Sequence, residues 1–172
     1  VAMCDAIEKA AGFRPGIKWT NDLVSDRRKL GGILTELRLD KNGNVDYAII
    51  GIGINCCQRE ADFPEEIRTV AGSLAMVTGA PVDRARLAAA ELEALHRMSA
   101  DLLPRKAQIM TRYRRDCITL GQEVSLVRGE EVRHGLAQDI DEDGALVVRF
   151  PDGHTEAVNS GEVSVRGMYG YV

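Results

Sequence analysis

The sequence has few aromatic residues, no long apolar run and no excess of positive charge. Aromatic residues make up 5% of the 172 residues, against 45% for hydrophobic residues as a whole, so the core must be mainly aliphatic. The net charge of −4 argues against a nucleic-acid-binding surface, which normally carries a basic excess. We expect neither a membrane segment nor a signal peptide, and therefore a cytoplasmic protein without membrane or nucleic-acid partners.

Cysteine is also scarce. The four cysteines, Cys4, Cys56, Cys57 and Cys117, are too irregularly spaced for a zinc site or a secreted disulfide framework. We interpret them as free thiols in a reducing compartment.

The apolar spacing predicts an α+β fold, with a mixed sheet and packed helices in its first part. One helix is predicted to end at Gly12, and a second to begin after Asp83. Between them "DKNGN" at 40–44 predicts a hairpin whose second strand, Val45–Ile54, is nearly all aliphatic or glycine, as in a strand covered on both faces. Because the first helix lacks an initiator Met and a capping residue, we expect the chain to be the C-terminal part of a longer protein.

From residue 119 the pattern changes to short strands separated by turns, which is typical of a small barrel or sandwich. The expected strands are 123–128, 132–140, 145–150 and 155–158. A unit of about fifty residues is near the lower limit for independent stability, so we expect it to pack against the first part. We therefore predict two domains, residues 1–118 and 119–172.

The segment "KWTND" is the first candidate for chemistry. Lys18 supplies a positive charge suited to a phosphate or carboxylate, Asn21 an amide, and Asp22 a carboxylate that could hold a metal ion. The alternative is a strand that ends in an ordinary Asx-type turn.

Two further candidates are rich in glycine. In "RRKLGGILTEL" the paired glycines leave the backbone bare beside Lys29, so a ligand can approach closely; the alternative is a solvated hairpin tip followed by a bulge. In "GIGIN" two glycines inside a strand leave room above it, and Asn55 can hydrogen-bond to whatever lies there.

In this order and spacing, "KWTND", "RRKLGGIL.E" and "GIGIN" resemble the catalytic core of the biotin protein ligases. The stretches "LGQEVSLV", "DIDEDGALVV" and "SGEVSVR" resemble the SH3-like C-terminal domain of that family. The resemblance implies a class II synthetase-like fold followed by a small SH3-like β-barrel. It also implies ATP-dependent formation of biotinyl-5′-AMP with Mg²⁺, then transfer of biotin to a lysine of a biotin carboxyl carrier protein. A homodimer is left open.

Carried over onto this sequence, the resemblance makes Lys29 and Asp22 the catalytic residues. Biotin would be bound by Lys29, Gly32, Ile33, Leu34, Gly51 and Gly53, and ATP by Lys18, Asn21, Asn55 and Arg166. Asp22 and Glu36 would lie at the Mg²⁺ ion, and Glu162 with Arg166 would help to close the site.

The sequence departs from the family pattern in two ways. Thr20 stands where the family usually has Pro, and the family's upstream Gly/Arg-rich loop and biotin head-group region are missing. We therefore expect an incomplete active site in these residues. Two alternatives follow: a non-catalytic fragment or paralogue that binds nucleotide or carrier protein, and a lipoate–protein ligase, against which "GIGIN" and the SH3-like tail argue.

Overall fold

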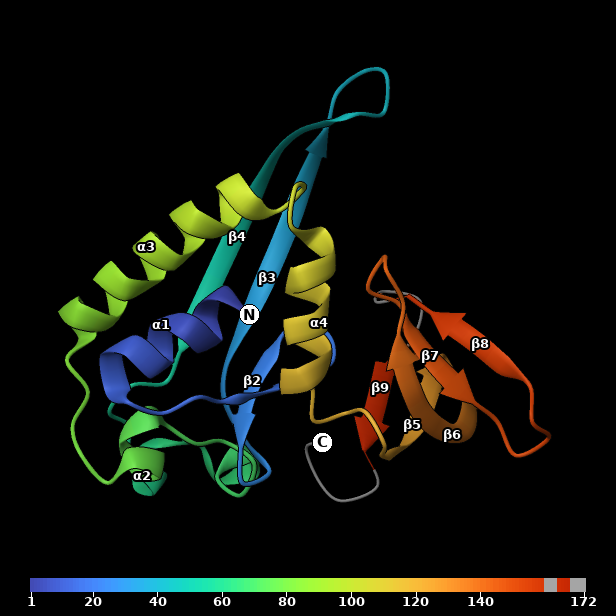
Figure 1. Ribbon diagram of the computed structural model, residues 1–172. Helices are drawn as coiled ribbons and strands as arrows, with labels where there is room; N and C mark the ends of the chain where they lie inside the picture. The colour runs from blue at the N-terminus through green and yellow to red at the C-terminus, as the bar shows by residue number, and fades with distance from the viewer. Residues whose placement is uncertain (160–163, 168–172) are drawn as a thin grey trace.

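The structure, a computed structural model, describes residues 1–159 and 164–167. Its fold is organised around two antiparallel sheets. The first sheet has the strand order β1-β2-β3-β4, and the second, here called the C-terminal sheet, has the order β8-β7-β6-β5-β9 (Figure 1). The strands are β1 (Gly16–Lys18), β2 (Asp22–Ser25), β3 (Arg28–Leu39), β4 (Val45–Ile54), β5 (Glu123–Arg128), β6 (Glu131–Ile140), β7 (Leu146–Arg149), β8 (Thr155–Val158) and β9 (Ser164–Gly167). The helices are α1 (Ala2–Ala11), α2 (Leu74–Thr78), α3 (Arg84–Asp101) and α4 (Lys106–Asp116), with short 3-10 helices η1 (Glu60–Asp62) and η2 (Glu65–Ile67). The predicted α+β class is confirmed. The predicted mixed sheet is not found, since the described strands pair antiparallel and parallel pairing is confined to the isolated bridges Ile17–Cys117 and Lys29–Ala71.

Helices α1 and α3 pack together over one face of the first sheet (Figure 1). Helix α1 ends where predicted, because Gly12 adopts the left-handed conformation with a φ of 69°. Helix α3 begins after Asp83, whose carboxylate accepts hydrogen bonds from the N–H groups of Ala85 and Arg86. The core beneath these helices is aliphatic, as expected; its members include Met3, Ile7, Leu23, Leu30, Leu74 and Leu87. Among the described residues, no helix has both the length and the apolar composition needed to cross a membrane.

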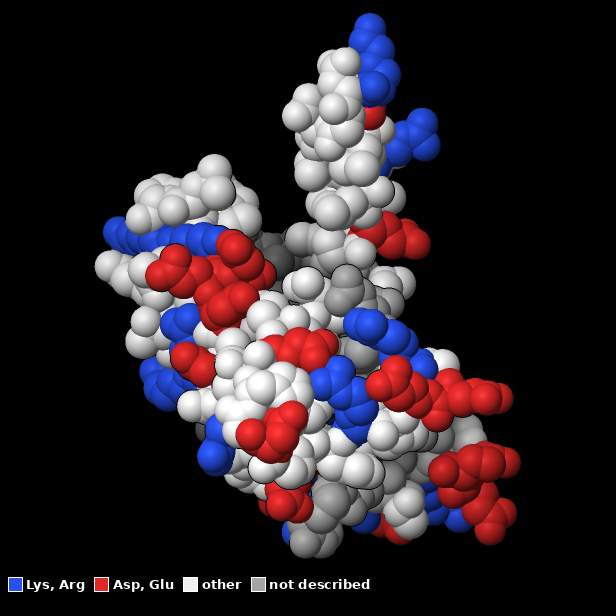
Figure 2. Space-filling model, turned by 90° about the vertical axis from the view of Figure 1, so that its right-hand side faces the viewer, with Lys and Arg blue, Asp and Glu red and all other residues white. Residues whose placement is uncertain are grey.

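The long β3–β4 hairpin confirms the predicted turn. The Asp40 carboxylate accepts hydrogen bonds from the N–H groups of Asn42 and Asn44 at 2.8 and 2.9 Å, and Gly43 has a φ of 84°. The expectation that β4 is covered on both faces is wrong. Residues 45–51 are exposed, because the hairpin extends past the helices that cover its base (Figure 1). In Figure 2 the hairpin projects as a largely uncharged arm with basic side chains near its tip.

The C-terminal sheet contains the four predicted strands close to their predicted bounds, and β9 adds a fifth. The predicted barrel does not close among the described residues, since β8 and β9 lie at opposite edges and pair with β7 and β5. Its core is formed by residues such as Val124, Leu146 and Val148, and Trp19 from the β1–β2 connection belongs to the same cluster. The C-terminal sheet therefore packs against the first part of the chain, as its small size predicts.

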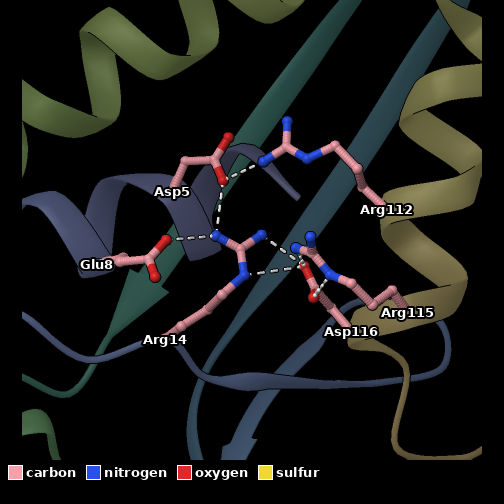
Figure 3. Close-up of polar contacts among 6 residues, drawn as sticks. All are labelled: Asp5, Glu8, Arg14, Arg112, Arg115 and Asp116. Atoms are coloured by element: carbon pink, nitrogen blue, oxygen red, sulfur yellow. Dashed lines mark hydrogen bonds and ion pairs between the residues drawn. The ribbon is translucent and has the colours of Figure 1, made fainter.

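A network of charged side chains ties α1 to the end of α4 (Figure 3). Arg14, between α1 and β1, donates to Asp5 and Glu8 of α1, each at 2.8 Å. Arg14 also donates to Asp116 of α4 at 2.5 and 3.1 Å, and Arg115 donates to the same carboxylate at 2.8 Å. Burial alone would raise the pKa of Asp116, but the hydrogen bonds from Arg115 and Arg14 outweigh it and lower the pKa to about 2. The ionised carboxylate therefore stabilises the folded state.

Replacing Asp116 by Asn should lower the free energy of unfolding by about 2 kcal/mol near pH 7, because one pKa unit corresponds to about 1.4 kcal/mol. The folded-state pKa lies below the ordinary value of 3.8, so this stabilisation is present above that value and is lost as the pH falls towards about 2. Urea unfolding of both proteins across this range measures the difference, which should close at the acidic end.

Glu93→Gln is the matched control, since it removes a carboxylate from an exposed pair with Lys9. Its loss of stability near pH 7 should be clearly smaller than that of Asp116→Asn, because exposed ion pairs contribute little. Equal losses in the two variants, or a loss in Asp116→Asn that persists at the acidic end, would contradict the assignment.

Candidate active site

A bulge in β3 turns Lys29 toward Asp22 on the neighbouring strand. Asp22 pairs with Gly32, whereas two residues later on β2 Val24 pairs with Lys29, so β3 has one residue more than β2 between these pairs. Because side chains alternate along a strand, the extra residue places Lys29 on the same face as Asp22 and Gly32. The Lys29 ammonium consequently lies 2.6 Å from the Asp22 carboxylate.

Two glycines in β3 make room for this arrangement. A Cβ at Gly32 would lie 3.0 Å from Oδ1 of Asp22 and 3.3 Å from Nζ of Lys29. A Cβ at Gly31 would lie 2.4 Å from the carbonyl oxygen of Gly53, so no side chain fits there between β3 and β4. The charged pair therefore stands beside bare main chain, with the Lys29 side chain 37% exposed and that of Asp22 15% exposed.

A cavity of about 560 Å³ opens beside Lys29. Its lining residues from the sheet are Lys29, Gly31, Gly32, Gly53, Ile54 and Asn55, and those from the segment after β4 are Gln58, Asp62, Phe63, Ile67, Val70 and Ala71. The volume suits a small organic ligand. One side of the cavity offers a cation and an amide. The other offers aromatic and aliphatic surface together with Gln58 and Asp62, whose carboxylate is paired with Arg59 at 3.1 Å. The cavity is thus suited to a ligand with an anionic part and an apolar part.

The wall formed by residues 58–71 was not predicted from the sequence. The backbone of Lys29 holds this wall in place: its N–H donates to the Val70 carbonyl at 2.7 Å, and its carbonyl accepts from the Gly72 N–H at 2.9 Å. The Asn55 side-chain amide donates to the Gly72 carbonyl at 2.9 Å. The available signal was the pair Phe63 and Ile67, two large apolar residues four apart in an otherwise charged stretch.

Five of the predicted site residues meet at this place: Asp22, Lys29, Gly32, Gly53 and Asn55. Lys18 lies opposite Asp22 on β1 and is buried, and the Asn21 side chain donates to the Ile33 carbonyl at the edge of the site.

Other predicted residues lie elsewhere. The Ile33 side chain packs against the core beneath the helices, while Leu34 and Gly51 pair with each other farther along the hairpin. The backbone of Arg166 pairs with Ser125 in the C-terminal sheet, and Glu162 lies outside the described residues.

The structure does not bring the two predicted metal ligands together. Glu36 lies four residues beyond Gly32, the partner of Asp22, and this corresponds to about 13 Å along the strand at ~3.3 Å per residue. Among the described residues, no group of three or more His, Cys, Asp or Glu side chains is placed to hold a metal ion. All four cysteines are free thiols, as interpreted.

The fold and the site together define an α+β protein with a charged pair beside an open cavity on an antiparallel sheet. Residues 1–55 match the Biotin/lipoate A/B protein ligase family, and residues 119–166 match the Biotin protein ligase C terminal domain. The biotin–[acetyl-CoA-carboxylase] ligase of Paracoccus denitrificans is 30% identical over 171 residues, which cover 97% of this chain and 70% of that protein. The chain therefore belongs to the biotin protein ligase family.

Two other relatives show how much of the family's length is represented. The bifunctional ligase/repressor BirA of Bacillus spizizenii is 32% identical over 154 residues, which cover 89% of this chain but 47% of that protein. The structure of the biotin protein ligase from Aquifex aeolicus in complex with biotin and ATP has a TM-score of 0.81 and 28% identity, and the match covers 96% of this chain and 68% of that one. The chain thus spans about half the length of the first of these relatives.

Gly31 of β3 and Gly53 of β4, which are diagonal neighbours in the ladder, give a sharp test of the geometry. Gly31→Ala should lower the free energy of unfolding by about 1–3 kcal/mol, because its Cβ meets the Gly53 carbonyl at 2.4 Å and the strands must separate. Gly53→Ala is the matched control, since a Cβ there meets no atom within 4 Å, and its loss should stay within about 1 kcal/mol. Urea unfolding measures both; equal losses would contradict the close approach at Gly31.

Proposed function

We propose that this chain is the part of a biotin protein ligase that holds the nucleotide and the carboxylate of biotin. In the proposed reaction the biotin carboxylate attacks the α-phosphorus of ATP, pyrophosphate leaves, and biotinyl-5′-AMP forms. A lysine amine of a biotin carboxyl carrier protein then attacks the carbonyl of this mixed anhydride, and AMP leaves. The observation that supports the proposal most is Lys29, which faces the cavity beside main chain left bare by Gly32.

Lys29 is proposed to contact the biotin carboxylate and the phosphoryl oxygens. Negative charge accumulates on these oxygens during in-line displacement, and a cation already in position stabilises it without reorganisation. Asp22, 2.6 Å away, would keep the ammonium group oriented before the ligands arrive. Gly32 and Gly53 would let the ligand rings lie against the main chain.

The remaining nucleotide contacts are proposed for Lys18, Asn21 and Asn55, which surround this centre, and for Arg166 of β9. A Mg²⁺ ion bound with nucleotide usually takes one or two carboxylates together with phosphate oxygens, and not a cage made by the protein alone. Asp22 is the carboxylate that would bind Mg²⁺ in this way. Glu36 does not fit this role, because of its distance along β3.

Two alternatives remain distinguishable. A lipoate–protein ligase is disfavoured by the match of residues 119–166 to the C-terminal domain of biotin protein ligases. The second alternative is a module that binds nucleotide or carrier protein without turnover. We further propose a domain boundary between residues 118 and 119 and a cytoplasmic location.

Lys29→Ala, in a protein that also carries the upstream part found in relatives, should lower biotin-dependent ATP–pyrophosphate exchange by at least about a hundredfold. Removal of one positioned charge typically costs about 3 kcal/mol of transition-state stabilisation. Lys29→Arg should also be poor, because a planar guanidinium does not replace the point charge of an ammonium group.

Lys41→Ala is the control, since Lys41 is an exposed cation in the turn of the β3–β4 hairpin. Its exchange rate should equal that of the wild type. Near-normal exchange in either Lys29 variant would remove the residue from its assigned role. Tight nucleotide binding without exchange in the wild type would favour the binding module.

We also propose that the protein forms a homodimer through the edge of β4. Among the described residues β4 is an edge strand, and its exposed side chains include Val45, Tyr47, Ile49 and Ile50. A long, apolar and exposed edge strand readily pairs with a second chain.

Ile49→Lys should shift the protein toward monomer in sedimentation velocity, because a charged side chain opposes edge-to-edge pairing. Leu92→Lys is the matched control: Leu92 is an exposed leucine on α3, outside the sheet, and the dimer fraction should not change. A monomeric wild type at high concentration would reject the proposed interface.

A further inference from the structure

The short connection between β1 and β2, residues 19–21, is anchored in the C-terminal sheet. Trp19 is 6% exposed and belongs to the core cluster of that sheet. Its indole N–H donates to the Gly144 carbonyl at 2.9 Å, and its backbone N–H donates to Oγ1 of the buried Thr119 at 2.9 Å. The Tyr113 hydroxyl of α4 donates to the Thr20 carbonyl at 2.8 Å. Three hydrogen bonds from separate parts of the chain therefore converge on two consecutive residues.

The turn that supplies the acceptor of the Trp19 indole, the Gly144 carbonyl, is itself fixed by hydrogen bonds. Gly144 lies in the turn between β6 and β7, with a φ of 90° that favours glycine. The Asp141 carboxylate accepts hydrogen bonds from the N–H groups of Asp143 and Ala145, each at 2.9 Å, and so fixes the turn. The Gly144 carbonyl is thus a positioned acceptor for the indole.

The same connection leads directly into the charged pair. The Asn21 carbonyl accepts from the Ile33 N–H at 3.0 Å, and Asp22, the next residue, lies opposite Gly32. The space that Gly32 leaves for Asp22 and Lys29 is narrow, since a Cβ there would already be 3.0 Å from Asp22. A rotation of residues 19–21 therefore moves the Asp22 carboxylate relative to the Lys29 ammonium.

We propose that Trp19 is a positioning residue, which uses its anchorage in the C-terminal sheet to set the position of Asn21 and Asp22 and thereby of Lys29. Packing alone would require a large apolar side chain at this place and no particular hydrogen bonds. The hydrogen bond from the indole to Gly144 and the one from the Trp19 backbone to Thr119 fix the orientation of the β1–β2 connection as well as the burial of the Trp19 ring. The inference rests on the proposed ligase function only for its activity measurement.

Trp19→Phe and Thr119→Val test the proposal. The first keeps an aromatic ring in the core but removes the donor to Gly144, and the second removes the acceptor of the Trp19 N–H. Val158→Ala, in the same core but away from the connection, is the control for general destabilisation. Two properties are measured: native-state hydrogen exchange at the Ile33 amide, and the kcat and KM of biotin-dependent ATP–pyrophosphate exchange in the protein with its upstream part.

In both test variants the Ile33 amide should exchange about tenfold faster than in Val158→Ala, after correction for global stability. The kcat should fall about tenfold or more, and by more than the KM for ATP rises, since small displacements of reacting groups are costly. The milder Thr119→Val keeps the test valid should Trp19→Phe fail to fold.

The outcomes separate this inference from the proposed function. Faster exchange at Ile33 in the two test variants, together with a wild-type protein that lacks ligase activity, would support the coupling and reject the ligase. Unchanged exchange and unchanged kcat in both test variants of an active ligase would reject the coupling. A loss of kcat equal to that of Val158→Ala would assign Trp19 to packing alone and would also reject it.

Discussion

The site depends on one extra residue in β3. Without the bulge, the alternation of side chains would turn Lys29 to the face of the sheet away from Asp22, and the cation would not meet the carboxylate. The bulge also leaves Leu30 free to fill the core, where it is completely buried. A single irregularity in the ladder thus supplies both a core residue and a charged centre from neighbouring positions. Gly32 completes the arrangement because it adds no side chain between the two charges.

The wall of the cavity depends on the same residue. The backbone N–H and carbonyl of Lys29 bond to Val70 and Gly72, so the strand that presents the cation also holds the segment that faces it. The two sides of the cavity are therefore kept in fixed relation through one peptide segment of β3. This arrangement explains how a loop rich in charged residues can present Phe63 and Val70 to the cavity.

The sequence predicted those features that depend on local conformation. Gly12 ends a helix, Asp83 caps one, and the Asn-Gly turn joins β3 to β4, because each of these roles is set by a few neighbouring residues. The candidate residues Asp22, Lys29 and Asn55 could be proposed from motifs and from the family resemblance. The bulge could not, since it is defined by the pairing of β2 with β3. Nor could the exposure of β4, which follows from how far the helices extend over the sheet.

Trp19 is the single tryptophan of the sequence. Its indole lies in the core of the C-terminal sheet, while its backbone belongs to the connection that leads to Asp22. The tryptophan fluorescence of the protein consequently comes from one known position at the junction of the two sheets. Spectral shifts and quenching of that emission report directly on the junction, without a label, during unfolding or ligand titration.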